Sequence, residues 1–598
     1  MFDSQMLITI LIIIIMFFMI IFEVLRIDLL AILCMLVLAW TGILDTSEAL
    51  SGFSSNAVVA MMAVMIMGRG VAKTGVIERF FHNVVFRRET IDRKGILGWM
   101  SLMIGTLSGF FQNIGAASLF LPAVITISRR KKIPASAIIM PVGFAAILGG
   151  TLSMVGSGSL ILVNDLLQNA SFEPYGLFSV TPVGIILLLT GVAFFVFFGK
   201  FLLPSSQPKD VKLSEQEKMI EAFHLPSRIY HYELPSTSNL IDKTAEGSGL
   251  WKKYRLNILG ITKGREVIYA PWRETRFKPG QELALLGNEE CIKRYSEDYG
   301  LISEDSSERL ASLGDPEQSG FAELIIPPRS DLIGQSIRQI SFRRRYEVEP
   351  VMMFSKGEKV EGDFSDHQVL VGDTLIVYGL WDKIAELKNN TELVVATSGD
   401  VDRKDYSKSG LAVSCFILAI ILALLRTPIS LAFFTGAVIM VLTGVLKLQE
   451  AYQAIEWKVI FLLAGLIPLG IAMQKTGTAS FLAEGLMKLV HDKHIVFTLL
   501  TIGAISTLFS LFMSNIGAIV VLAPLVISMA ALSGLDARPL VLLAAVCTSN
   551  SFILPTHQVN ALMMSSGGYK NQDYIKAGSG LTLLFLIIVV SVFYFFYI

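Results

Sequence analysis

The chain has 598 residues, of which 53% are hydrophobic and 17% are charged, and its formal net charge is zero. Its mean hydropathy is +0.60, and many apolar runs approach the roughly 20 residues needed to cross a bilayer. These values predict an all-α polytopic membrane protein and give no reason to expect a nucleic-acid partner. The four cysteines are too scattered for a metal site or a disulfide framework. No nucleophile–base set is evident, so we predict neither an enzyme nor a bound cofactor.

The first membrane repeat is expected at residues 1–203. It opens with three apolar runs, about Met6–Phe22, Asp28–Leu44 and Ala57–Val71. The first run lacks a basic leader and a small-residue cleavage site, so it is predicted to span the membrane and not to be a cleaved signal. The mixed-charge stretch Val76–Lys94 then suits a helix at the membrane interface.

A hairpin is expected next, at about residues 95–128. The apolar segment Gly95–Ser128 is interrupted at Gln112-Asn113 and closed by the basic cluster Arg129–Lys132. Basic residues at both ends favour the cytoplasmic side for both ends. Arms of about 15 residues are short for full spans, so we expect a re-entrant hairpin; two ordinary spans with a short outer turn are the alternative.

A helix broken in mid-membrane is expected at Ala135–Leu167, where Gly156-Ser157-Gly158-Ser159 interrupts the apolar pattern. The loop Asn164–Tyr175 carries the acids Asp165 and Glu173 but no Lys or Arg, which predicts an outer location. Ser179–Leu203 then returns to the cytoplasm.

A soluble cytoplasmic insert is predicted at Pro204–Lys408, where the composition becomes charged and rich in turn residues. It repeats itself at an offset of 92, which predicts two α+β domains at residues 204–310 and 311–408. The matches are Asn239-Leu240-Ile241 with Asp331-Leu332-Ile333, Tyr254 with Tyr346, Gly280 with Gly372, and Gly287 with Gly379.

The second membrane repeat, residues 409–598, is expected to follow the plan of the first. Its predicted elements are spans near Gly410–Leu425, Ile429–Leu446 and Lys458–Met473, an amphipathic stretch at Thr478–Lys493, a hairpin at His494–Ser533 (about residues 494–533), a broken helix at Pro539–Ser565 interrupted at Pro555-Thr556-His557, and a last span at about Ile575–Ile598.

The two membrane halves match without a gap at an offset of 402. The matches are Thr41-Gly42 with Thr443-Gly444, Glu48-Ala49 with Glu450-Ala451, Gly68 with Gly470, Lys73-Thr74-Gly75 with Lys475-Thr476-Gly477, Asn113-Ile114-Gly115-Ala116 with Asn515-Ile516-Gly517-Ala518, and Pro122 with Pro524. The number of preceding spans predicts that the first hairpin enters the membrane from the cytoplasm and the second from outside. The sequence therefore predicts an inverted repeat, the architecture of secondary transporters with a site at the bilayer midplane.

Two hairpin tips and two broken helices would place irregular backbone around one cavity. Helix N-termini there favour anions, whereas carbonyl ends and Asn, Ser and Gln oxygens can hold sodium. No Asp or Glu lies near either tip in the sequence. Proton-coupled transporters need a titratable relay in the membrane, so sodium coupling is favoured over proton coupling.

The expected ligand-contacting residues each have a structural alternative. Asn113 and Asn515 could only cap helices or bond between helices, and the same holds for Gln112 and Ser514. His557 could contact substrate, titrate, or be a hydrogen-bonded structural histidine. Ser108 and Ser510 could bond back to their own helices, and the glycines Gly149, Gly150, Gly156 and Gly158 could serve helix packing.

At the tips and breaks the pattern resembles the divalent anion:sodium symporter family of the ion-transporter superfamily. That family carries a paired Ser-Asn-Thr motif at its hairpin tips. The equivalents here are Gln112-Asn113-Ile114 and Ser514-Asn515-Ile516, which keep the Asn and lose the Thr in both copies. The breaks resemble the family at Gly149-Gly150-Thr151 through Gly156-Ser157-Gly158, and at Pro555-Thr556-His557-Gln558 with Asn560 and Gly567-Gly568-Tyr569.

The resemblance implies two sodium sites with a substrate between them. One sodium would be held by Ser108, Gln112, Asn113 and the backbone near Gly156, and the other by Ser510, Asn515 and the backbone near Pro555. The expected substrate contacts are Gln112, Asn113, Ser514, Asn515, Thr556 and His557. Ile114 and Ile516 replace threonines that help bind carboxylates in the family, so a sulfate-like oxyanion is expected beside a carboxylate.

The insert resembles two RCK C-terminal domains, a combination found in a bacterial branch of the family. The resemblance implies a homodimer in the bacterial inner membrane, moving a small anion with Na⁺ by elevator-type alternating access. It also implies a small nucleotide-like regulatory ligand on the cytoplasmic domains, although no GxGxxG motif opens the insert. The alternatives are a cation/proton antiporter of the same superfamily and a ligand-gated channel.

Overall fold

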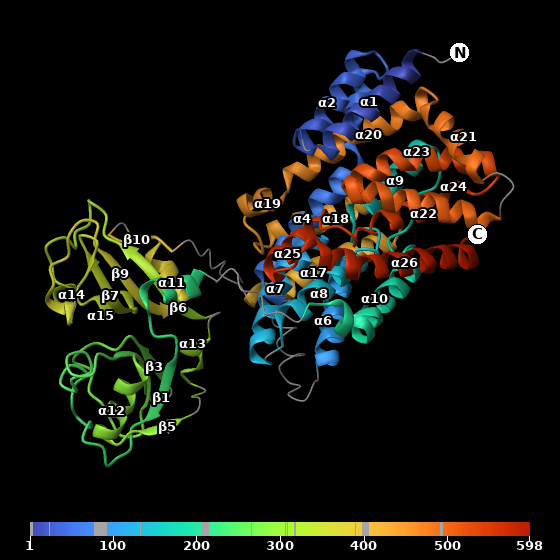
Figure 1. The fold of residues 1–598 in the computed structure, drawn as a ribbon. Helices are drawn as coiled ribbons and strands as arrows, with labels where there is room; N and C mark the ends of the chain where they lie inside the picture. Colours follow the sequence, from blue (N-terminus) through green and yellow to red (C-terminus); the bar gives the residue numbers. More distant parts are fainter. Residues whose placement is uncertain are drawn as a thin grey trace. The chain divides into compact units, whose positions relative to one another are not determined.

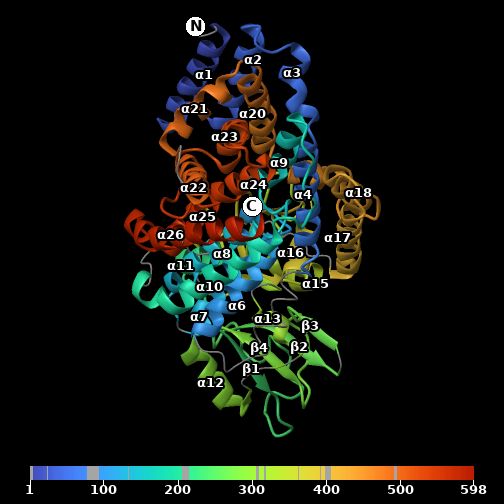
Figure 2. The ribbon, with the colours of Figure 1, turned by 90° about the vertical axis from the view of Figure 1, so that its right-hand side faces the viewer.

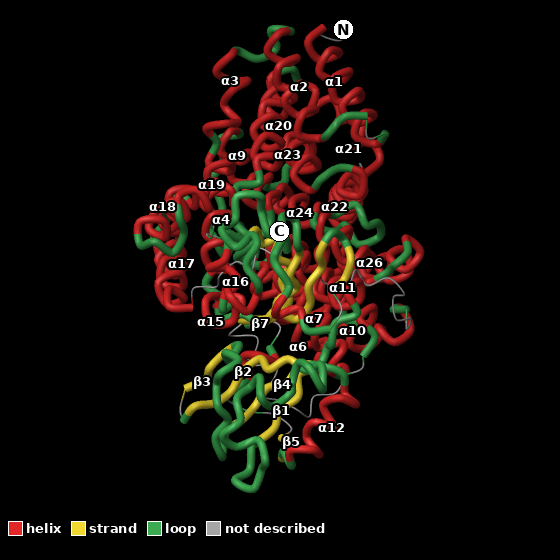
Figure 3. The backbone as a smooth tube through the Cα atoms, turned by 90° about the vertical axis from the view of Figure 1, so that its left-hand side faces the viewer, coloured by secondary structure: helices red, strands yellow, loops and turns green. Residues whose placement is uncertain are grey.

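The chain divides into two compact units, Met1–Val211 with Lys404–Ile598, and Lys212–Arg403. The computed structural model describes residues 4–22, 24–76, 93–131, 133–204, 215–264, 266–304, 307, 309–315, 318–360, 362–388, 390, 392–397, 406–490 and 494–598 (Figure 1). Figure 3 shows helices throughout the first unit and strands only in the second. Most of the interfacial helix expected at Val76–Lys94 lies outside the described residues.

The first half of unit 1 consists of helices whose breaks fall at glycine and polar runs. They are α1 (Ser4–Ile21), α2 (Ile27–Trp40), α3 (Thr46–Leu50), α4 (Asn56–Lys73), α6 (Arg93–Ser108), α7 (Asn113–Arg130), α8 (Ile139–Gly149), α9 (Gly158–Asn169) and α10 (Thr181–Leu202).

The second half repeats this order. Its helices are α17 (Ser409–Leu424), α18 (Ile429–Leu442), α19 (Leu448–Ala454), α20 (Trp457–Lys475), α21 (Thr478–Val490), α22 (Ile495–Phe512), α23 (Asn515–Ser533), α24 (Ala537–Thr548), α25 (Gln558–Gly567) and α26 (Asn571–Phe596). Among the described residues, seven helical segments are long and apolar enough to cross a membrane. The prediction of a polytopic helical protein is therefore confirmed.

The two halves contact each other reciprocally. Lys73 Nζ lies 2.6 Å from a Glu450 carboxylate oxygen, and its counterpart Lys475 Nζ lies 2.8 Å from Glu48. The packing of α4 on α18 has its counterpart in that of α20 on α2, and Figure 2 shows α4 beside α18. A contact between residue i of one half and j of the other, matched by j with i, indicates an approximate two-fold relation between the halves. Their orientation relative to a membrane stays a prediction.

Unit 2 contains two antiparallel five-stranded sheets of one topology. The first has the order β3-β2-β4-β1-β5 and the second β10-β6-β9-β7-β8, which is the same order read from the other edge. The strands are β1 (Ile229–Glu233), β2 (Asn257–Lys263), β3 (Glu266–Tyr269), β4 (Glu282–Leu286), β5 (Ile302–Glu304), β6 (Ser319–Ile325), β7 (Glu349–Ser355), β8 (Glu358–Lys359), β9 (Thr374–Leu380) and β10 (Val394–Val395).

The strand pairing of the two sheets matches at an offset of 92 residues, and even its irregularities fall at equivalent positions. A bulge lies between Ile258 and Gly260 in one sheet and between Pro350 and Met352 in the other. The isolated bridge Thr244–Arg276 likewise corresponds to Ser336–Gln368. Unit 2 is therefore an internal duplication, and the kinship of each copy to RCK C-terminal domains stays a prediction.

Two details differ from the sequence-based expectations. Both broken helices open earlier than the expected interruptions at Gly156 and Pro555, because α8 ends at Gly149 and α24 ends at Thr548. Asp165 does not lie in an outer loop but in α9, with only 6% of its surface exposed. Its Oδ2 accepts the Ala57 N–H at 2.7 Å. The carboxylate on α9 thus lies at the start of α4.

Candidate functional site

Four helices of unit 1 begin at one cavity. The first residues of α7, α9, α23 and α25 are Asn113, Gly158, Asn515 and Gln558, and all four line it. The cavity has a volume of about 130 Å³. Each N-terminus presents free N–H groups and positive partial charge. None of the described residues that line the cavity carries a charged side chain, so the helix ends dominate its electrostatics.

The cavity brings together most of the residues that the sequence singled out, although they come from four distant segments. Those lining it are Gln112, Asn113, Gly156, Ser510, Ser514, Asn515, Thr556 and His557. Ser108 lies behind Asn113 and is not part of the lining, and Pro555 precedes the lining residue Thr556. The structure thus gathers these side chains, while their ligand roles stay predictions.

At the first hairpin tip the Asn113 amide sits among oxygens. With its nitrogen turned toward them, it donates to Ser108 Oγ at 2.8 Å, Gly156 O at 3.1 Å and Ala146 O at 3.3 Å. This orientation satisfies both ends of the amide. Ala146 lies in the last turn of α8, where carbonyl oxygens carry negative partial charge. The same oxygen set could hold a cation if the amide turned its Oδ1 inward.

The second tip shares Asn-Ile-Gly-Ala with the first but has Ser514 in place of Gln112, and its hydrogen bonds differ. Ser514 caps α23, because its Oγ accepts the Gly517 N–H at 3.2 Å. Ser510 Oγ donates to Thr507 O at 2.9 Å, which is a bond back to its own helix. The Asn515 side chain makes no hydrogen bond with other described residues and lies in the cavity wall.

His557 is the N-cap of α25, and its Nδ1 accepts the Val559 N–H at 3.2 Å. A neutral imidazole whose Nδ1 accepts a bond carries its proton on Nε2. His557, which lines the cavity, therefore has an unused Nε2–H donor in addition to its structural role as a cap.

An apolar belt completes the cavity. Met61 and Leu462, from α4 and α20, face Ile114 and Ile516 of the hairpins. A Cβ on Gly158 would lie 2.8 Å from Ile516 Cδ1 and 2.9 Å from Met61 Cε, so any larger residue there would have to push these side-chain ends aside. Sequence reasoning missed Met61 and Leu462, because nothing in the sequence distinguishes them from the other apolar residues of a membrane-spanning segment.

Sequence reasoning also missed a buried polar cluster next to the second tip. It is formed by α22, the loop after α24, α25 and α26, and its members are Ser506, Thr507, Ser549, Asn550, Ser551, Asn560 and Thr582, each at most 7% exposed. The run Thr548-Ser549-Asn550-Ser551, four polar residues inside an apolar segment, was the available signal.

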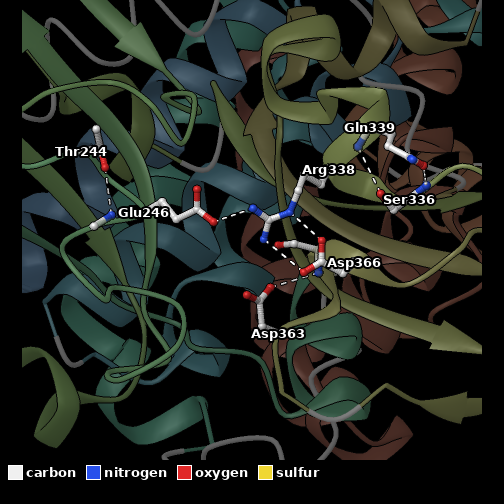
Figure 4. Close-up of polar contacts among 9 residues, drawn as sticks. Thr244, Glu246, Ser336, Arg338, Gln339, Asp363 and Asp366 are labelled. Atoms are coloured by element: carbon white, nitrogen blue, oxygen red, sulfur yellow. Dashed lines mark hydrogen bonds and ion pairs between the residues drawn. The ribbon is translucent and has the colours of Figure 1, made fainter.

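Unit 2 has a cavity between its two copies. Its lining includes Glu246, Trp251, Lys252, Arg273 and Arg338. Figure 4 shows Arg338 between Glu246 of one copy and Asp366 of the other, and each of these carboxylates lies 2.6 Å from its guanidinium. Glu246 and Arg338 are equivalent positions, 92 residues apart.

The positive charge at this cavity affects a neighbouring acid. Burial alone would raise the pKa of the Asp363 carboxyl, but hydrogen bonds from Ser365 and the charges of Lys252 and Arg338 bring it below the usual value. The cavity is thus able to stabilise negative charge.

Comparison with known proteins agrees with a transporter. The chain is 28% identical to an uncharacterized transporter of Synechocystis sp. over 97% of this chain and 95% of the relative, and 26% identical to an uncharacterized transporter of Escherichia coli over 94% and 95%. It is 23% identical to the sodium/sulfate cotransporter 1 of Chlamydomonas reinhardtii over 56% of this chain and 39% of the relative. The family model described as citrate transporter matches residues 17–547. Since that match covers most of the sequence, the chain belongs to the citrate transporter family, a family of membrane transporters and not of enzymes.

Proposed function

We propose that this protein is a secondary transporter that moves a small anion, sulfate-like or a carboxylate, together with sodium. The observation that carries the proposal is the convergence of four helix N-termini on one uncharged cavity. Helix N-termini bind anions through backbone N–H groups without a cationic side chain. Substrate would contact Gln112, Asn113, Ser514, Asn515, Thr556 and the His557 Nε2–H.

Sodium would bind at the two hairpin tips. At the first, Ser108 Oγ and the carbonyl oxygens of Gly156 and Ala146 lie within 3.3 Å of the Asn113 amide nitrogen. With the Asn113 amide turned so that its Oδ1 points inward, and with the Gln112 amide oxygen, they would form a neutral oxygen set at helix C-termini and unwound backbone, the kind of set that holds Na⁺ in transporters. At the second, Ser510, Asn515 and the backbone near Pro555 would do so.

The apolar belt favours a compact substrate. Ile114 and Ile516 line the cavity without offering the hydroxyl groups that would bond carboxylates. Relatives with lower coverage carry the name sodium/sulfate cotransporter, which supports both the oxyanion and the sodium in this proposal.

The wider arrangement follows the same proposal. The two-fold relation of the halves would be an inverted repeat in a bacterial inner membrane, with elevator-type movement in a homodimer. The second unit would be a cytoplasmic pair of RCK-C-like domains. A nucleotide-like ligand in the cavity beside Arg338 and Arg273 would regulate transport.

Uptake into proteoliposomes tests the transport proposal. Labelled sulfate and a labelled dicarboxylate are offered with an inward sodium gradient, with sodium equal on both sides, and with choline in its place. We expect sulfate uptake that requires the sodium gradient. Uptake at the same rate with and without sodium would contradict sodium coupling. No uptake of either anion would contradict the proposed class of substrate.

One observation favours a second candidate, a proton-coupled transporter. Asp165 is a buried carboxylate on α9, the helix whose other end lines the cavity, and membrane carboxylates often serve proton relays. Uptake driven by a pH gradient without sodium, and abolished by Asp165→Asn, would select this candidate.

A further inference from the structure

The polar cluster beside the second tip holds oxygens that the described residues do not satisfy. Side-chain oxygens without a hydrogen-bond partner among the described residues are Ser506 Oγ, Ser549 Oγ, Asn550 Oδ1, Ser551 Oγ, Asn560 Oδ1 and Thr582 Oγ1. All six side chains are at least nine-tenths buried. Buried polar atoms are nearly always bonded in native proteins, so such a concentration calls for a ligand, an ion or ordered water.

Hydrogen bonds hold the segments of this cluster together. Asn550 Nδ2 lies 3.2 Å from Thr507 Oγ1 on α22 and 3.4 Å from Thr582 O on α26. Asn560 Nδ2 donates to Ser551 O at 2.7 Å. Both amides thus use their nitrogens to fix the loop, which leaves their Oδ1 atoms free to accept.

The fold itself does not require polar residues here. Six of its members have counterparts 402 residues earlier, which are Ile104, Gly105, Ile147, Leu148, Gly149 and Gly158. In that half Ile104, Ile147 and Leu148 are at most 1% exposed, so the counterparts of Ser506, Ser549 and Asn550 are apolar core residues. The second half keeps hydroxyls and amides at a cost in stability, which points to a function.

The chemistry of the cluster selects a cation. Its free atoms are neutral oxygens, and the loop follows the C-terminus of α24, where the helix dipole is negative. Carbonyl and side-chain oxygens at unwound helix ends hold sodium in transporters. The cluster also adjoins the candidate site through Ser510, which lines the cavity and bonds to Thr507 O one turn away.

We propose that oxygens of the Ser506, Asn550, Asn560 and Thr582 side chains bind a further sodium ion, beside those at the two tips. This ion would stabilise the loop between α24 and α25 and so preorganise the His557 end of the cavity. The proposal deepens the proposed sodium-coupled function and rests on it for the role of the ion in transport. Its binding can be measured without transport.

The test replaces two members by apolar residues of similar size. Asn550→Leu reproduces Leu148 of the first half, Thr582→Val keeps the shape of the side chain, and each removes one of the unpartnered oxygens. Thr501→Val is the matched control, because Thr501 is half-buried on α22 and its hydroxyl only bonds back to Phe497 O. Binding of ²²Na⁺ and sodium-dependent thermal stabilisation are measured on the full-length protein in detergent.

We expect each cluster variant to lose one bound sodium per chain, and the sodium concentration for half-maximal stabilisation to rise about tenfold. In choline, Thr582→Val should melt at the same or a higher temperature, because an unsatisfied oxygen has been removed. Asn550→Leu should melt at a lower temperature, because it also removes the two hydrogen bonds of Asn550 Nδ2. If one variant fails to fold, the other and Ser506→Ala carry the test. Thr501→Val should behave as wild type.

The outcomes separate this inference from the proposed function. If wild type binds sodium and Asn515→Ala loses an ion while the cluster variants lose none, the cluster holds only water and this inference fails alone. If wild type binds no sodium, both this inference and the sodium coupling fail. Sulfate uptake without sodium dependence would then leave only the anion part of the proposed function.

Discussion

The two hairpin tips share the sequence Asn-Ile-Gly-Ala but differ in their bonding. Asn113 is fixed among Ser108 Oγ, Gly156 O and Ala146 O, whereas the Asn515 side chain has no such partners among the described residues. One tip is preorganised by hydrogen bonds, and the other keeps its amide available at the cavity. The difference arises in the breaks: the first brings carbonyl oxygens to its asparagine, while the second turns its polar groups into the neighbouring buried cluster. A shared Asn-Ile-Gly-Ala core therefore does not give identical sites.

Asn113→Ala and Asn515→Ala should show the largest difference between the tips. Asn113→Ala removes the donor to three buried oxygens and should lower the free energy of unfolding by about 1–3 kcal/mol. Asn515→Ala should change it by less than about 0.5 kcal/mol. Both should reduce sodium-dependent sulfate uptake more than tenfold. Thermal melting in detergent and proteoliposome uptake check this, and equal losses of stability would contradict the asymmetry.

Gly158→Ala should narrow the cavity from the first break. The new Cβ would press on Ile516 Cδ1 and Met61 Cε, which are ends of flexible side chains and can move into the substrate space. We expect the KM for sulfate to rise about tenfold, equivalent to ~1.4 kcal/mol of binding free energy. The double variant with Ile516→Val, which removes the Cδ1 atom, should recover part of the affinity. No recovery would place the effect elsewhere.

Ser108→Ala and Ser510→Ala compare the serines one turn before each tip. Ser108 Oγ bonds to the Asn113 amide, so its loss should cost about 1 kcal/mol of stability. Ser510 bonds only to its own helix among the described residues, so Ser510→Ala should leave the melting temperature nearly unchanged. Its sodium concentration for half-maximal uptake should nevertheless rise. Unchanged sodium dependence in Ser510→Ala would remove this residue from the sodium site.

The reciprocal ion pairs should show the smallest effect. The Lys73 side chain is 19% exposed and the Lys475 side chain 45%. Screening weakens the more exposed pair, so Lys73→Met should lower stability by about 0.5–1 kcal/mol and Lys475→Met by less. Double-mutant cycles with Glu450→Gln and Glu48→Gln measure each coupling. The reverse order would show that exposure does not set their strength.

Several features could be predicted from particular residues. The 402-residue register of Lys73 with Lys475 and of Asn113 with Asn515 anticipated both the order of helices and the gathering of the tips at one cavity. The 92-residue register anticipated two copies in the insert, which have the same strand order. Apolar length and polar interruption are local properties, so they can be read from the chain.

Other features depended on long-range packing. Nothing in the sequence around Ala146 indicates that its carbonyl faces Asn113, because a backbone oxygen has no residue-type signature. Asp165 looked like an outer-loop acid until the packing of α9 against α4 buried it against the Ala57 N–H. Met61 became a cavity residue only through the position of α4.

The sequence by itself thus determined the membrane class, the duplications and the presence of a break in each half. Periodicity, segment length and internal register depend only on the order of the residues. Only the tertiary structure decided which helix ends meet, which tip is fixed by hydrogen bonds and which oxygens are left without partners, because these depend on distances between segments hundreds of residues apart.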